Sequence, residues 1–87
     1  MAQLGADVDQ LDTLARRFDE EANKIQQTIS TIGSQLQGTW WHGGDADRFR
    51  NDWQSNHTAN LRNVCQSLQN AAQACRAQAN EQRQASS

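Results

Sequence analysis

The sequence contains no proline, no tyrosine and only five glycines among its 87 residues. Four of those glycines, at 33, 38, 43 and 44, fall in one short stretch. A protein built from many short strands needs turn signals about every 8–12 residues. The shortage of turn residues therefore excludes that class and favours long helices with a single interruption.

The sequence also lacks blocks of charge and long apolar runs. Eight basic residues face ten acidic ones, for a net charge of −2, and no basic cluster of the kind that binds nucleic acid occurs. A cleavable signal peptide needs an apolar run of about 7–15 residues behind a basic start, and a membrane span needs about 20. Neither run is present, so we expect no signal peptide, no membrane span and no nucleic-acid partner.

No catalytic or metal-binding constellation is evident. The acidic residues are scattered, and the chain shows neither a phosphate-binding loop nor a nucleophile with an adjacent base. On one helix, His57 and Cys65 would lie about 12 Å apart along the axis, too far to share a metal ion. We therefore expect no enzyme activity, no cofactor and no metal site.

The two cysteines, Cys65 and Cys75, are ten residues apart. On a straight helix that separation is about 15 Å, whereas a disulfide needs Cα atoms within about 7 Å. An intrachain disulfide is excluded on that basis. Two interpretations of the cysteines stay open. They are either small residues packed between the helices or partners in an intermolecular disulfide in an oxidising compartment.

What the sequence does contain is a heptad pattern in its first half. Apolar residues follow one another at alternating steps of four and three. They are Leu4, Val8, Leu11, Ala15, Phe18, Ala22, Ile25, Ile29, Ile32 and Leu36. A sustained 3.5-residue repeat predicts a long helix with coiled-coil-like packing.

A second helix is predicted after the glycine-rich stretch. Asp45 suits the N-cap, and Asp47 suits the positive end of the helix dipole. An apolar stripe begins at Ala46, weakens at Asn56, His57 and Asn60, and then resumes. The resumed stripe consists of Leu61, Cys65, Leu68, Ala72, Cys75 and Ala79, with Val64 and Ala71 beside it. The polar interruption predicts either solvent-facing side chains or a buried polar group that fixes the register.

Together these patterns predict one all-α domain over residues 1–87, an antiparallel two-helix hairpin. The first helix is expected at about 4–37, the turn at 38–44, the second helix at about 45–80, and a frayed tail at 81–87. Because Leu14, Val64 and Ala71 widen the stripe beyond what one partner helix covers, the hairpin should pair with a second one into a four-helix bundle dimer. The expected seam of the hairpin and dimer is formed by Leu4, Val8, Leu11, Phe18, Ile25, Ile29, Ile32, Leu36, Leu61, Val64 and Leu68.

The turn itself contains a recognisable motif. Trp41-His42-Gly43 lies between the two predicted helices and is followed by Ala46, Phe49 and Trp53. This arrangement resembles the WXG100 (ESAT-6-like) family, and the resemblance extends over the whole chain: its length, two helices, central motif and lack of a signal peptide. It implies that the protein is bacterial and is exported as a folded dimer, with itself or a related WXG100 protein, by a type VII (ESX-type) secretion machine. On the same basis, Trp41 and Gly43 would belong to the secretion signal, and the protein would act as a secreted effector or system component.

One family feature is missing. The second helix in the family carries a tyrosine followed, four residues later, by aspartate or glutamate. Here Cys75 and Ala79 occupy the corresponding register. The resemblance therefore implies that a partner supplies this signal.

Three alternatives remain open on sequence alone. In the first alternative, the aromatic residues Trp40, Trp41, Phe49 and Trp53 plug the end of the bundle, because large rings bury much area near a turn. The heptads would serve a cytoplasmic helical adaptor without export equally well. The chain would also suit the N-terminal targeting domain of a longer toxin.

Overall fold

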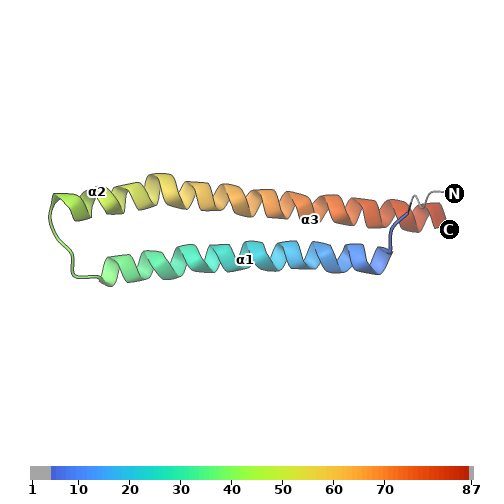
Figure 1. Ribbon diagram of the computed structural model, residues 1–87, viewed down its shortest axis with the longest axis horizontal. Helices are drawn as coiled ribbons and strands as arrows, with labels where there is room; N and C mark the ends of the chain where they lie inside the picture. The colour runs from blue at the N-terminus through green and yellow to red at the C-terminus, as the bar shows by residue number, and fades with distance from the viewer. Residues whose placement is uncertain (1–4, 87) are drawn as a thin grey trace.

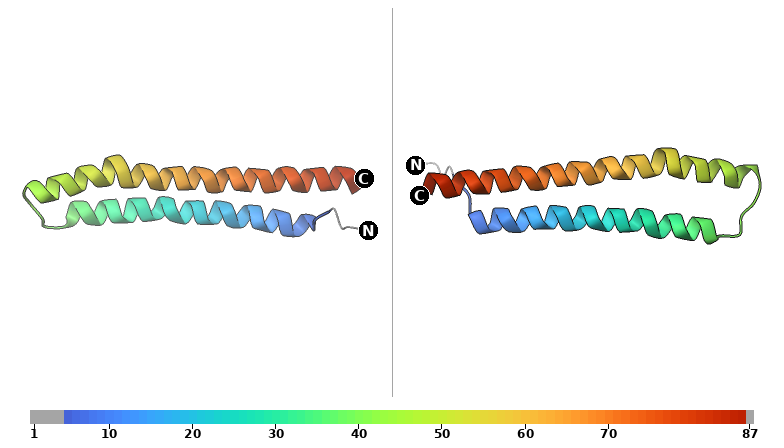
Figure 2. Two further views of the ribbon diagram at one scale, coloured as in Figure 1. Left: turned by 45° about the horizontal axis from the view of Figure 1, so that its top comes forward. Right: turned by 180° about the vertical axis from the view of Figure 1, so that it is seen from behind.

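The computed structural model describes residues 5–86 and shows a single long helical hairpin, 66 × 18 × 17 Å in extent (Figure 1). The first limb is α1 (Val8–Gly38). The second limb is one nearly continuous rod made of α2 (Gly44–Asp52), η1 (Trp53–His57) and α3 (Thr58–Ser86). The limbs run antiparallel, so the start of α1 and the end of α3 lie at the same end (Figures 1 and 2). No strand occurs over residues 5–86, which confirms the predicted all-α hairpin.

The first helix begins later than its sequence pattern suggests. The Asp7 carboxylate accepts a hydrogen bond from Gln10 N at 3.0 Å, which caps the helix and fixes its start at Val8. The predicted start near residue 4 is therefore too early. The residue that caps the helix, Asp7, comes later in the sequence than the first apolar residue of the pattern. Leu4 lies outside the described residues. At the other end, α1 continues through Gly38, and Thr39 N donates to Leu36 O.

The two limbs meet along a seam of small residues. The residues buried to 6% exposure or less are Ala15, Ala22, Ala46, Thr58, Cys65, Ala72 and Ala79. Within each limb most of these positions are seven residues apart, as the heptad requires. Small side chains let the helix backbones approach closely, and the Cys65 thiol donates to the Ala22 carbonyl across the seam at 3.4 Å. No large side chain among the described residues is fully buried, so the apolar bulk of the chain lies beside the seam, not within it.

The second limb contains one turn of π-helix, η1, where its apolar stripe is interrupted. A π-helix turn accommodates one extra residue, so the seam steps by five residues from Trp53 to Thr58 before the alternation of three and four resumes. His57 and Asn60 are consequently exposed, as one of the two sequence interpretations expects. The buried polar residue of the seam is Thr58.

The second helix extends past its predicted end near residue 80, because α3 remains helical through Ser86; the fraying expected for residues 81–87 stays a prediction. The sequence lacks an apolar anchor there, but polar contacts hold the segment. Arg83 forms an ion pair with Asp12 of α1 and also donates to Asn80. The long-range ion pair fixes the last turns of α3 against the first turns of α1.

Candidate pairing face and tryptophan–glycine turn

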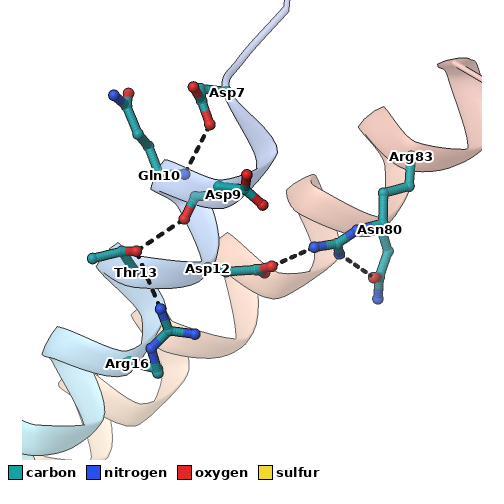
Figure 3. A network of polar contacts seen from close by, with 8 residues as sticks. All are labelled: Asp7, Asp9, Gln10, Asp12, Thr13, Arg16, Asn80 and Arg83. Carbon is teal, nitrogen blue, oxygen red and sulfur yellow. Dashed lines mark hydrogen bonds and ion pairs between the residues drawn. The ribbon is translucent and has the colours of Figure 1, made fainter.

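One side of the hairpin is polar and carries the ion pairs that link its two limbs. Asp19 lies four residues after the seam residue Ala15, and Arg76 lies four residues after Ala72, so both flank the seam on the same side. They form an ion pair, and Asp12 and Arg83 form a second one nearer the open end. Figure 3 shows Arg83 reaching across to Asp12, beside the Asp7 cap of α1.

The opposite side of the hairpin is apolar. Residues three after, or four before, a seam residue lie on this side, and in both limbs nearly all of them are aliphatic, aromatic or cysteine. On α1 they are Leu11, Phe18, Ile25 and Ile32, and on α3 they are Leu61, Leu68 and Cys75. Further out on the same side, Leu14 and Val64 are 45% and 46% exposed.

The expected seam residues therefore divide into two groups. Val8, Ile29 and Leu36 continue the line of Ala15 and Ala22, and are half-buried between the limbs. The other described members lie on the apolar side, where Ile32 is 40% exposed and the rest, apart from Val64, are half-buried. We call this surface the apolar side; it comprises Leu11, Leu14, Phe18, Ile25, Ile32, Leu61, Val64, Leu68, Ala71 and Cys75. A contiguous apolar surface of this kind is typical of a protein–protein contact.

The turn depends on the backbone conformation of Gly43. Its φ is 117° and its ψ is −179°, a region that residues with a Cβ rarely adopt. Gly43 directly precedes α2, and its carbonyl accepts from Asp47 N in the first turn. The glycine of the motif thus sets the direction in which the second limb leaves the turn.

Trp41 lies against the start of the second limb. Its ring centroid is 5.5 Å from that of Phe49, and the Arg50 guanidinium lies 6.0 Å from the centre of its ring. Trp41 is half-buried and Phe49 is 44% exposed. The pair closes part of the turn while leaving an accessible aromatic surface at this end of the hairpin.

Arg50 ties the turn together, a role that no pattern in the sequence indicates. Its guanidinium donates to three carbonyl oxygens: Trp41 O at 2.8 Å, Thr39 O at 3.1 Å and Leu36 O at 3.3 Å. Leu36 is in the last turn of α1, where carbonyl groups lack helical partners and carry partial negative charge. Arg50 therefore caps the first limb from the second and fixes the path of the chain between them.

Trp40 and Trp53 do not join the aromatic contact of the turn. Trp40 is 86% exposed and meets only the edge of His42, at 5.2 Å between ring centroids. Trp53 faces α1 at Gly33: a Cβ built on that glycine would lie 3.9 Å from the indole Nε1. A single plug of all four aromatics at the bundle end is therefore not what the structure shows.

The remaining candidate groups are separate from one another. Cys65 is buried in the seam, Cys75 is half-buried on the apolar side, and both are free thiols. Over residues 5–86 no group of three or more histidine, cysteine or acidic residues is placed to hold a metal ion. Within the same range, no helix is both long and apolar enough to span a membrane.

Comparison with protein-family models, with curated proteins and with solved structures found no match to this chain.

Proposed function

We propose that this protein is a non-enzymatic helical hairpin of the WXG100 type, which pairs with a second hairpin and is exported by a type VII secretion system. The observation that carries the pairing is the difference between the two sides of the hairpin. One side is closed by the ion pairs Asp12–Arg83 and Asp19–Arg76. The other side leaves large apolar groups such as Leu14, Ile32 and Val64 at least 40% exposed.

Pairing through the apolar side gives a four-helix bundle. A lone two-helix hairpin has a thin interior, and among residues 5–86 the fully buried side chains in it are small ones. A second hairpin laid on the apolar side would remove Phe18, Ile25 and Leu68 from water and supply the large-residue core that the single chain lacks. The partner in this proposal is a second copy or a related hairpin.

The export proposal rests on the turn. Gly43 holds a conformation that favours glycine, and Trp41 is kept against Phe49 and Arg50 with part of its ring accessible. A rigid, partly exposed tryptophan at the end of a rod is a suitable recognition element, since aromatic anchors dominate many protein contacts. The missing tyrosine signal would be provided by a related partner chain.

Export is tested by expressing the protein, with its partner, in cells that have an active type VII system and measuring the amount in the culture supernatant. We expect Trp41→Ala and Gly43→Ala to reduce export, while Trp40→Ala leaves it unchanged because the Trp40 side chain is 86% exposed and takes no part in the Trp41–Phe49 contact. Circular dichroism of the cell-retained variants checks that they remain helical. Normal export of both turn variants, or export in cells without the motor ATPase, would contradict the proposal.

A further inference from the structure

A groove lies near the turn, on the side of the hairpin opposite the apolar side. It has a volume of about 530 Å³, within the range of about 300–1,000 Å³ that is usual for ligand pockets. Gly33, four residues after Ile29, and Arg62, four residues after Thr58, place it on the side of the ion pairs. A hairpin paired through its apolar side would therefore leave this groove open.

The groove exists because Gly33 faces Trp53 across the two limbs. With no side chain at Gly33, the nitrogen edge of the indole borders open space; a Cβ there would come into ordinary contact with it, at 3.9 Å. Ile29 and Leu36 add an apolar wall. No residue over the described range 5–86 accepts a hydrogen bond from Trp53 Nε1, so this donor is available in the groove.

Thr58 is a polar residue that lines the groove. It is 6% exposed, and it is the one buried polar residue in the described part of the chain. Over residues 5–86 no fully buried side-chain nitrogen or oxygen atom lacks a hydrogen-bond partner, so Thr58 by itself does not point to a ligand.

The electrostatics of the groove favour an anion. Arg50 and Arg62 line it, and no aspartate or glutamate does. The Arg50 guanidinium donates its hydrogen bonds to backbone carbonyl oxygens, which are uncharged, so its positive charge is not paired with a carboxylate. Arg62 has no hydrogen-bond or ion-pair partner among the described residues, whereas Arg76 and Arg83 are both paired with aspartates.

We propose that this groove binds an acidic peptide segment of a partner protein. A carboxylate would accept from the Arg62 guanidinium and the Trp53 indole. An aliphatic side chain next to it in the peptide would pack on Ile29 and Leu36. The groove is independent of export, and of which hairpin covers the apolar side.

A nucleic acid fits the groove less well than an acidic peptide. Binding a phosphate backbone needs a series of basic side chains along the path of the strand. Here the chain has a net charge of −2, and several acids lie along the limbs outside the groove. The isolated pair of arginines matches one or two carboxylates, not a strand of phosphates.

The test is a titration of the full chain, labelled with nitrogen-15, in which the three tryptophan indole signals are observed by NMR; Trp53→Phe assigns the signal of Trp53. The probe is an acetylated, amidated hexapeptide of alternating glutamate and leucine, and its control is the same peptide with glutamine for glutamate. We expect the Trp53 signal to move with the glutamate peptide only. Arg62→Gln should weaken binding about tenfold or more, the loss expected for a charge-assisted contact. Arg16→Gln makes the same change of charge far from the groove and should leave binding unchanged.

Equal binding of the glutamine peptide, or no effect of Arg62→Gln, would overturn the proposal. So would acetate binding as tightly as the peptide, which would indicate a small-anion site, or a single-stranded RNA binding more tightly than the peptide. Sedimentation of the same samples reports hairpin pairing separately, so a failure here does not bear on the proposed function.

Discussion

Arg76 on α3 forms an ion pair with Asp19 on α1, and the pair lies to one side of the alanine seam. At the same level on the other side, Phe18 and Cys75 occupy the corresponding positions. The hairpin thus has a side that satisfies its own charges and a side whose apolar groups remain partly exposed. This difference is the physical basis for the proposed pairing.

The closeness of the two limbs should make the seam intolerant of larger side chains. Ala22 is fully buried and its carbonyl accepts from the Cys65 thiol. We expect Ala22→Leu to lower the free energy of unfolding by about 1–3 kcal/mol, because overpacking forces the limbs apart. Ala77→Leu, on an exposed position of α3, should change it by less than about 0.5 kcal/mol. Urea denaturation at one fixed protein concentration measures both, and equal effects would show that the seam is not closely packed.

The backbone at Gly43 should be sensitive to a single methyl group. A Cβ there meets nothing within 4 Å, so any cost of Gly43→Ala comes from the φ of 117° and not from a clash. We expect a loss of about 1–3 kcal/mol. Gly38→Ala is a matched control, since Gly38 also has open space around it but lies within α1 at negative φ. It should be neutral or stabilising by up to about 1 kcal/mol. Thermal unfolding measures the stability of both variants. Equal changes in stability for Gly43→Ala and Gly38→Ala would contradict the role of Gly43.

Arg50 should contribute more to stability than any other arginine near the turn. Arg50→Gln removes three hydrogen bonds to carbonyl oxygens and the contact with Trp41. We expect a loss of about 2 kcal/mol, typical of hydrogen bonds to a charged group. Arg50→Lys should restore only part of it, because an ammonium group cannot span the same acceptors as a planar guanidinium. Arg48→Gln, an exposed residue paired with Asp45, should have almost no effect. Similar losses for Arg48→Gln and Arg50→Gln would rule out the clamp.

Charges placed on the apolar side should prevent pairing without unfolding the hairpin. Val64 is 46% exposed, so Val64→Glu costs the single chain little. In a bundle the same glutamate would be buried without a partner, at a cost of several kcal/mol. Size-exclusion chromatography with light scattering should show dissociation of this variant, while Gln26→Glu, on the polar side of α1, still pairs. Dissociation of the Gln26 variant instead would place the contact on the other side.

The overall hairpin can be predicted from sequence because its main signals are local and redundant. The heptad from Val8 to Leu36 and the glycines at 43 and 44 each point to the same two limbs and the same turn. Details that depend on contacts between distant residues cannot be read in this way. α3 continues to Ser86, and near its end Arg83 pairs with Asp12 across the hairpin, a contact that the local pattern does not indicate.

The site was less predictable than the fold. Trp41 and Gly43 can be identified from their spacing, but Arg50 resembles any other exposed arginine until the turn is folded. The π-helical turn is similar: Asn56, His57 and Asn60 show that the stripe is interrupted, yet solvent-facing side chains and a buried polar group both explain the interruption. Only the structure shows that Thr58, and not His57, enters the seam.

The most direct test of the account is the mass of the folded protein in solution, measured by sedimentation equilibrium over a range of concentrations, alone and with a related hairpin. One chain has a mass of 9.7 kDa, so a pair of copies has 2 × 9.7 = 19.4 kDa. The account predicts a helical species of about two chains, in one sample or the other, that dissociates with Val64→Glu. A helical, cooperatively folding monomer of one chain mass at all concentrations in both samples would contradict it.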